Sequence, residues 1–292
     1  MNTEKVKNIL IFVLIITILT LGSLALAEEN HYRLTQNQED AIISILNRNG
    51  IAVYADIIRD FSPLPQLSLE MTSPDLDDIA GRFFQDETYY ITEDVHHFIF
   101  EAQSRRMTFF RFDNKLRFEI HDGFNNSDFI ERGATASSSQ ILAESYVRNL
   151  VGIPNSMEFS SISLNFMGDY VITYFGNYRN FVIYNNQIRV RVTEAGVTRI
   201  YYSYSPIQGV LDNDVFIVSA DEALLSLINH LRTSGVLDGD DIILTNIQLM
   251  HFITESGIAS PAYVFSLFID RIQFNFIFDA QTNGFLYYES IW

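Results

Sequence analysis

The chain has 292 residues, a formal net charge of −17 at pH 7, 48% hydrophobic residues and no cysteine. This acidic balance excludes a nucleic-acid partner, because phosphate binding needs a basic surface. The lack of cysteine excludes disulfides and a cysteine-linked lipid, so an exported domain must be stabilised by its own core. With 24 Phe and 15 Tyr, a chain of this length has the apolar residues to build that core.

The N-terminus has the pattern of a membrane-spanning segment. Lys5 and Lys7 precede a charge-free run from Ile9 to Ala27, and two glutamates follow that run directly. As a helix this run would be about 28 Å long, close to the ~30 Å hydrocarbon core of a bilayer. By the positive-inside rule, we expect a cytoplasmic tail at 1–8, a transmembrane anchor at 9–27 and an ectodomain outside the cytoplasm. The predicted localisation is therefore the cell membrane, with a single span.

A cleaved signal peptide is the alternative interpretation of the same segment. Ala25-Leu26-Ala27 fits the small-x-small pattern that signal peptidase cleaves. The apolar run is longer than the hydrophobic region of a typical signal peptide, which favours the anchor. Both interpretations place the rest of the chain outside the cytoplasm.

Small and weakly polar residues recur along one side of the predicted span: Thr17, Thr20, Ser23 and Ala27. In lipid, such residues let helices approach closely and form hydrogen bonds across the contact. We therefore predict that these four residues contact a partner's transmembrane helix. The alternative is that they belong to the polar end of a signal peptide.

The first part of the ectodomain, residues 28–132, is predicted to be an α+β domain. Apolar periodicity and Asn49-Gly50 predict a helix from Gln36 to Asn49. Pro74 opens a second short helix, for which Ser73 is the expected N-cap. Four short aromatic runs then predict antiparallel strands at 88–92, 95–102, 107–112 and 115–121.

Turn-forming residues between 123 and 139 predict a boundary, after which the C-terminal α+β ectodomain extends over 133–292. Two similar helix-sheet units are expected in it, at about 137–209 and 217–292. Their helices are predicted at 139–150 and 220–234. Ser219 and Glu222 form the pattern of a capping box at the start of the second helix.

Each predicted helix is followed by a hairpin pattern. Ile188, Val190 and Val192 alternate with polar residues before a turn at Ala195-Gly196. Phenylalanines alternate in the same way before a turn at Asn283-Gly284. The predicted fold class is thus α+β, with an N-terminal transmembrane helix followed by units of one helix on an antiparallel sheet. The closing turn Asp279–Gly284 looks like that of PepSY-like domains, so these units are PepSY-like by resemblance.

Motifs that carry chemistry are missing from the sequence. The adjacent His96 and His97 would point to opposite faces of a strand, which is poor geometry for one metal ion. The acidic cluster Asp238–Asp241 lacks the ligand spacing of an EF-hand loop. No nucleophile elbow, phosphate loop or dinucleotide fingerprint occurs. We therefore expect no catalytic, metal or cofactor-binding residues, and a chain that is not an enzyme.

The layout of the chain carries a family resemblance. Its parts are Asn49-Gly50-Ile51 ending the first helix, Pro63-Leu64-Pro65, Tyr174–Gln187 with Gly176 and Phe181, Ile188–Val192, and the final turn Asp279–Gly284. With the short basic tail and single span, this arrangement resembles the YycI-type regulatory proteins of the WalK–WalR (YycG–YycF) two-component system of Gram-positive bacteria. The resemblance implies a non-enzymatic regulator whose span contacts a WalK/YycG-like sensor histidine kinase, together with a YycH-like sister protein.

Two functional hypotheses follow. The first is a membrane-anchored extracytoplasmic regulator that modulates a sensor histidine kinase through transmembrane and ectodomain contacts. The alternative is an exported PepSY-like binding module that inhibits or sequesters a wall hydrolase or protease, since an acidic surface suits a basic partner. An exported hydrolase with paired carboxylates is a third interpretation.

Overall fold

The computed structural model describes residues 33–291, apart from 72, 113, 166 and 239–240. Its described residues divide into two compact units, each assembled from separate stretches of the chain. Unit 1 contains 33–64, Phe216–Gln248 and Tyr263–Ser290, and unit 2 is built mainly from Pro65–Val215 and Leu249–Ala262. Both units are mixed α+β.

The predicted anchor at 9–27 lies outside the described residues. Within the described part of the chain, none of the helices has the length and apolar character needed to cross a bilayer. The predicted boundary between residues 132 and 133 falls inside unit 2, where helix α4 ends.

Unit 2 is organised around an antiparallel sheet. Its strands run in the order β7-β8-β9-β10-β6-β5-β4-β3. Their bounds are β3 (Tyr90–Glu93), β4 (His97–Glu101), β5 (Arg105–Phe110), β6 (Lys115–Phe124), β7 (Met157–Leu164), β8 (Tyr170–Tyr178), β9 (Phe181–Thr193) and β10 (Gly196–Ser203). The aromatic runs at 88–121 therefore form antiparallel strands, as predicted.

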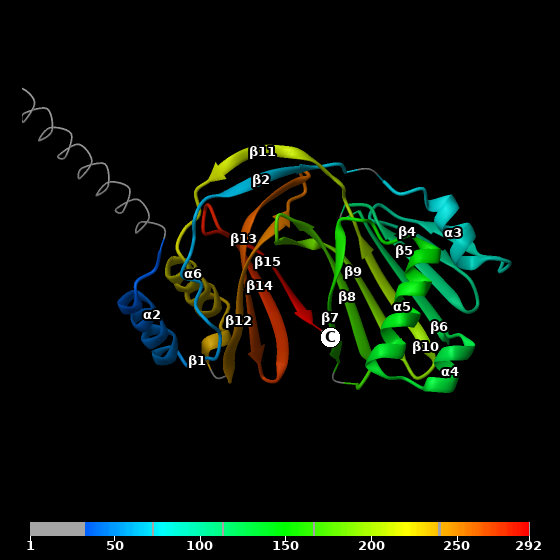
Figure 1. Ribbon diagram of the computed structural model, residues 1–292, viewed down its shortest axis with the longest axis horizontal. Coiled ribbons are helices and arrows are strands. Elements are labelled where there is room, and N and C mark those ends of the chain that lie inside the picture. Colours follow the sequence, from blue (N-terminus) through cyan, green and yellow to red (C-terminus); the bar gives the residue numbers. More distant parts are fainter. Residues whose placement is uncertain (1–32, 72, 113, 166, 239–240, 292) are drawn as a thin grey trace, which may run out of the picture. The chain divides into compact units, whose positions relative to one another are not determined.

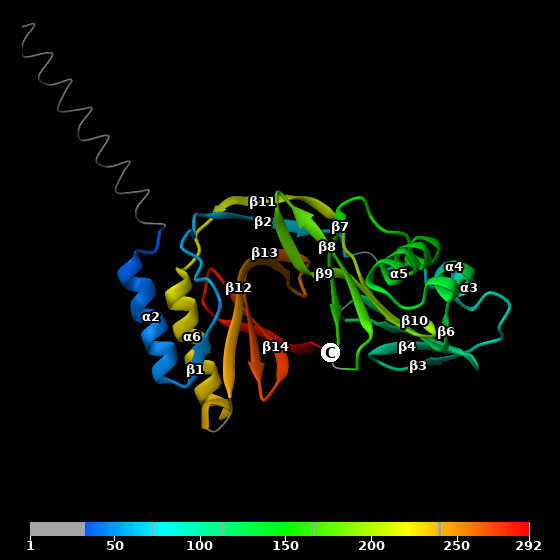
Figure 2. The ribbon, with the colours of Figure 1, turned by 60° about the horizontal axis from the view of Figure 1, so that its bottom comes forward.

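Helices cover one face of this sheet: α3 (Leu76–Phe84), α4 (Ser127–Arg132) and α5 (Ala136–Leu150). Figure 2 shows all three on the same side of β10, β6 and β4. Phe83 and Phe118 are both fully buried, and their ring centroids lie 5.1 Å apart. Because side chains alternate along a strand, every second residue from Leu116 to Ile120 of β6 and from Ile188 to Val192 of β9 enters this core.

Unit 1 also packs helices against strands (Figure 1). Its elements are α2 (Gln36–Arg48), β1 (Ile51–Val53), α6 (Ala220–Thr233), the 3-10 turn η1 (Val236–Asp238), β14 (Ile272–Asp279), β15 (Phe285–Ile291) and parts of β12 (Ile242–Ile253) and β13 (Ile258–Ile269). An apolar stripe of α6, formed by Leu224, Leu227, Ile228 and Leu231, is buried, with exposures from 0% to 2%. Tyr263 fixes the entry to this helix, because its hydroxyl donates to the Val218 carbonyl at 2.7 Å.

Two further strands belong to unit 2. They are β2 (Leu64–Leu69) and β11 (Ile207–Val215), which pair with each other. The tip of the β12–β13 hairpin joins them, since Ile258 lies in register with Ser68. Near this tip, His251 of β12 lies in parallel register with Ile183 of β9.

Three of the predicted helices are confirmed, α2, α5 and α6, but the expected caps need correction. Helix α3 begins at Leu76 rather than at Pro74, because the Asp75 carboxylate accepts from the Asp78 amide at 3.1 Å and acts as N-cap in place of Ser73. Helix α5 starts at Ala136, three residues earlier than predicted, with Thr135 as its cap.

The predicted capping box at the start of α6 is wrong. Ser219 is the N-cap residue by position, but its side chain makes no cap hydrogen bond to the helix. Its hydroxyl donates instead to the carboxylate of Asp221. The first turn of α6 therefore lacks the reciprocal bonds that Ser219 and Glu222 would have made.

The predicted turn between β9 and β10 depends on Gly196. Its φ of +104° is strained for an L-residue, and a Cβ there would lie 2.0 Å from the Phe124 carbonyl oxygen. A side chain at this position would push β10 away from β6, with which it pairs through Val197 and Phe124.

We expect Gly196→Ala to lower the free energy of unfolding by about 3 kcal/mol, because backbone strain and a backbone clash act together. Gly152→Ala, at φ +79° with open space around the added carbon, should cost only about 1 kcal/mol. Gly209→Ala, with neither strain nor clash, should leave stability unchanged or slightly higher. Urea unfolding monitored by circular dichroism measures all three, and equal losses at Gly152 and Gly196 would contradict the proposed clash.

Candidate functional site

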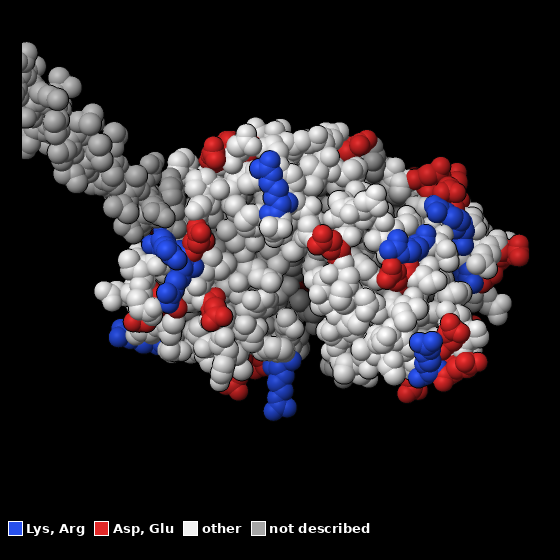
Figure 3. All heavy atoms as spheres, in the orientation of Figure 1, with Lys and Arg blue, Asp and Glu red and all other residues white. Residues whose placement is uncertain are grey.

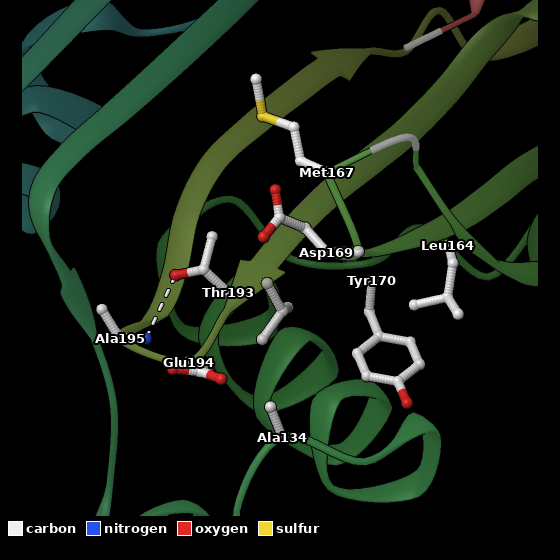
Figure 4. A pocket seen from close by; sticks show the side chains of 10 residues that line it. Ala134, Leu164, Met167, Asp169, Tyr170, Thr193, Glu194 and Ala195 are labelled. Atoms are coloured by element: carbon white, nitrogen blue, oxygen red, sulfur yellow. Dashed lines mark hydrogen bonds between the residues drawn. The ribbon is translucent and has the colours of Figure 1, made fainter.

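A hollow of about 480 Å³ opens at the rim of the unit 2 sheet. Two turns, β7–β8 and β9–β10, and the segment before α5 form its walls, as Figure 4 shows. Its polar lining comes from Asp169, Thr193 and Glu194, and its apolar lining includes Met167 and Tyr170. The hollow therefore combines polar groups with apolar side chains, of which Met167 and Leu164 are exposed.

Local hydrogen bonds shape both turns. The Asn165 side-chain oxygen accepts from the amides of Met167 at 3.0 Å and Asp169 at 2.9 Å, which folds the β7–β8 turn back on itself. The Thr193 hydroxyl accepts from the Ala195 amide at 3.2 Å and does the same for the β9–β10 turn. Short polar side chains thus position the rim of the hollow.

The main carboxylate of the hollow is already paired. Asp169 has a side chain that is 15% exposed, and its Oδ2 accepts from the Arg191 Nε at 2.8 Å. Glu194 is exposed at the opposite turn. Among the described lining residues there is neither a histidine nor a cysteine that would activate a nucleophile.

Arginine residues are concentrated on the sheet face opposite the helices. In one cross-strand row, Arg191 of β9, Arg199 of β10, Glu119 of β6, Arg106 of β5 and Glu101 of β4 follow each other in register. We call this side of the sheet the arginine face. Its arginines are Arg106, Arg191 and Arg199 in this row and Arg117 and Arg189 in the neighbouring row. Its charges contrast with the acidic balance of the whole chain.

A second row lies two residues along the strands. Here Thr173, Arg189, Tyr201, Arg117 and Thr108 follow each other in register from β8 to β5. The guanidinium of Arg117 lies 5.5 Å from the centre of the Phe110 ring. Arginine stems therefore lie along this face and leave their charged ends at the surface.

Ion pairs hold the arginine face together. Glu119 lies 3.1 Å from Arg199 Nη2 and 3.7 Å from Arg117 Nε, so one carboxylate serves two guanidinium groups. Arg106 and Glu101 approach only to 4.0 Å. Elsewhere the charges are dispersed: Figure 3 shows acidic and basic side chains scattered over one side of the molecule, with uncharged surface between them.

The predicted transmembrane contacts Thr17, Thr20, Ser23 and Ala27 lie outside the described residues and stay predictions. The sequence did not reveal the arginine face as a site. The alternation in Ile188–Val192 predicts that Arg189 and Arg191 point away from the core. The same stretch does not reveal which residues of β10, β6 and β5 lie beside them, because register depends on packing of the whole sheet.

The adjacent histidines His96 and His97 bond to Asp94. Asp94 accepts from the amides of His96 and His97, and its carboxylate lies 3.2 Å from the His97 Nδ1. These hydrogen bonds, chiefly the one from the His97 side chain, lower the pKa of Asp94. Within the described part of the chain, no group of three metal-ligating side chains comes together.

His251 is fully buried in unit 2. Its Nε2 lies 2.7 Å from the Pro65 carbonyl oxygen, so Nε2 carries the proton and donates. Its Nδ1 is buried without a hydrogen-bond partner among the described residues. Burial lowers the pKa of His251, and the hydrogen bond to Pro65 offsets part of that effect. The folded protein therefore holds this imidazole neutral.

Comparison with known proteins gives remote structural neighbours. No protein-family model matches the chain, and no curated protein does. An uncharacterized protein from Eubacterium rectale superimposes with a TM-score of 0.47 at 10% identity, over 82% of this chain and 91% of that one. The YpeB C-terminal domain from Bacillus megaterium gives 0.36 at 10% identity, over 76% and 99%. YycH from Bacillus subtilis gives 0.43 at 11% identity, over 74% of this chain and 53% of that one.

The buried histidine predicts how stability depends on pH. Below about pH 6.5 the unfolded chain takes up a proton at His251 that the folded protein excludes, so the free energy of unfolding falls as pH falls. This loss of stability continues until the pH reaches the lowered pKa that His251 has in the folded protein. Over that range the free energy of unfolding falls by at most about 1.4 kcal/mol per pH unit. Burial also lowers the pKa of His230, which adds to the same trend.

Urea unfolding at pH 7.5 and pH 5.5 measures this dependence. We expect His251→Gln, whose side-chain amide can still donate to Pro65, to reduce the difference between the two pH values. The matched control is His121→Gln at an exposed position, which should leave the difference unchanged. Equal pH dependence in His251→Gln and the wild type would contradict the assignment.

Proposed function

We propose that this chain is a non-enzymatic, membrane-anchored extracytoplasmic regulator that modulates a sensor histidine kinase. The proposal combines contacts of the span in the bilayer with contacts of the ectodomain outside. The observation that carries it is the charge-free run from Ile9 to Ala27, joined to an ectodomain that offers binding surfaces. Its layout, which resembles the YycI-type regulators, supports the same interpretation and suggests a YycH-like sister protein.

The binding surfaces of the ectodomain support a contact role. In the rim hollow of unit 2, Asp169 is paired with Arg191, and the arginine face carries charge in ordered rows. Neither arrangement brings a nucleophile beside a general base among its described residues. Both suit reversible contact with another protein.

The small side chains of the predicted span provide the direct test. Replacing Thr17, Thr20 and Ser23 together with leucine should reduce the amount of co-purified kinase about tenfold, because bulky residues keep helices apart. The measurement is co-purification of the full chain with a co-expressed WalK/YycG-like sensor kinase, from membranes solubilised in a mild detergent.

Ala25→Leu is the matched control. At about 100° per residue, position 25 faces away from the side shared by Thr17, Thr20 and Ser23, while the change is again from small to bulky. This variant should retain the kinase. Unchanged co-purification and signalling in the triple variant would contradict regulation through the bilayer.

The N-terminus of the mature protein separates this proposal from an exported inhibitor. We expect the mature protein to stay in the membrane fraction and to retain the segment before Glu28, because the apolar run needs hydrocarbon around it. N-terminal sequencing and fractionation measure this. A freely soluble protein that begins at Glu28 would instead favour the PepSY-like module that inhibits or sequesters a wall hydrolase or protease.

A further inference from the structure

We propose that the free edge of strand β11 binds an extended, basic segment of a partner protein by strand addition. This inference deepens the proposed function, on which it rests for the existence of an ectodomain partner, by naming the chemistry that the partner presents. The observations are an unpaired strand edge, two carboxylates without a basic partner, and the exposure of both.

Strand β11 has one paired side and one free side. Among the described strands it pairs only with β2, and Figures 1 and 2 both show it along the outer side of β2. The Pro206 carbonyl, directly before β11, accepts at 2.9 Å from the amide of Glu70, directly after β2. Since the backbone groups of successive residues point to opposite sides of a strand, the even-numbered residues of β11 face β2 and the odd-numbered residues face away.

Unmet backbone donors and acceptors therefore line the free side of β11. Gly209, Leu211 and Asn213 present their N–H and C=O groups there, and none of these groups bonds to a described residue. An approaching chain can reach them, because every residue from 210 to 214 is exposed. An added strand would pair with these groups through main-chain hydrogen bonds.

Two carboxylates on β11 lack a basic partner. Asp212 and Asp214 are two residues apart, so their side chains leave the same face of the strand about 6.7 Å apart. The Asp212 Oδ1 accepts from the Asp214 amide at 3.1 Å, but no described lysine or arginine pairs with either carboxylate. Residues 200–231 contain four acidic residues and neither lysine nor arginine. The negative charge of this strand is therefore left unpaired within the described part of the chain.

Side chains on β11 define what an added strand should carry. Ile207 packs against a buried apolar cluster that includes Leu67, whereas the even-numbered side chains, among them Val210 at 38% exposure, are open to solvent. Residues directly opposite each other on neighbouring strands interact, and opposite charges in that position stabilise the pair. A partner strand with basic residues at alternate positions would thus meet Asp212 and Asp214 in turn.

A basic segment fits this edge better than a second copy of the chain. Two β11 strands paired through Asn213 would place the carboxylates of one copy opposite those of the other, which destabilises the pairing. Charged residues on an edge strand keep identical copies apart in this way, but they attract a strand of opposite charge. The net charge of −17 acts in the same direction over longer distances.

The other free edges of the unit 2 sheet are poorer templates. Strand β3 has only four residues, and its Glu93 already pairs with Arg111. Strand β7 is longer, but its pairing with β8 shifts register between Phe159 and Ser161, and such a bulge bends an edge strand. Strand β11 combines nine residues with unpaired charge.

Fluorescence anisotropy with a labelled peptide tests the inference. The probe is a short peptide in which lysine alternates with threonine, added to the full chain in a non-ionic detergent. We expect saturable binding that weakens several-fold when salt rises from about 50 to 200 mM. Two control peptides should not bind. One has glutamine in place of lysine, and the other keeps its lysines but has N-methylated backbone amides, which cannot donate to a strand.

A proline on the free edge tests the backbone contact. Leu211→Pro removes one outward N–H and leaves the groups that face β2 in place, so it should weaken binding about tenfold. The matched control is Leu211→Ala, which loses the same side chain but keeps the N–H. This variant should bind like the wild type.

Neutral variants test the charge contact. Asp212→Asn with Asp214→Asn should weaken binding about fivefold, because two cross-strand charge pairs are lost while the side-chain oxygen at position 212 can still accept the amide. The matched control is Asp122→Asn with Glu131→Gln, which removes the same charge at exposed positions elsewhere in unit 2 and should leave binding unchanged. This comparison keeps the test valid if Leu211→Pro folds poorly.

Three results would overturn the inference: no binding of the lysine peptide, equal binding of its N-methylated form, or equal binding by folded Leu211→Pro and Leu211→Ala. Equal loss in the two double variants would also overturn it, in favour of general attraction between a basic peptide and an acidic chain. The assay contains no kinase, so its failure would leave the proposed contact through the span intact, and loss of that contact would leave peptide binding intact.

Discussion

Burial of one face of the unit 2 sheet beneath α3, α4 and α5 is the constraint on which the rest of this unit depends. Phe118, Val190 and Ile200 enter that core from three adjacent strands and are fully buried. Since side chains alternate along a strand, the residues between them must point the other way. The same packing that forms the core therefore creates the arginine face. The core and the arginine face are two consequences of one alternation.

Charge is distributed unevenly in this acidic chain. Arg191, Arg199 and Arg106 lie in one cross-strand row, and their partners Glu119 and Asp169 are themselves partly buried, at 21% and 15% exposure. Partly buried ion pairs are screened less by salt than fully exposed ones. One sheet face of unit 2 therefore has a defined charge pattern within a chain whose overall balance is acidic.

Local patterns predicted most helices and strands, but not their exact ends. The stripe of α6 and the alternation in β9 depend on neighbouring residues alone, so the sequence reveals them. Caps depend on which side chain reaches a free amide. Asp75 does so instead of Ser73, and Ser219 bonds to Asp221 rather than to the helix amides. Several side chains compete for these bonds, and the pattern does not rank them.

The sequence by itself determined the charge-free run at 9–27, the acidic balance of the residues after it, and the strand alternation that points Arg189 and Arg191 away from a core. Only the tertiary structure decided which charges meet. Arg199 and Glu119 are neighbours because β10 pairs with β6, and Arg106 joins them through β5. Register between distant strands follows from packing of the whole sheet, so no local pattern contains it. Assembly of each unit from separate stretches of the chain has the same cause.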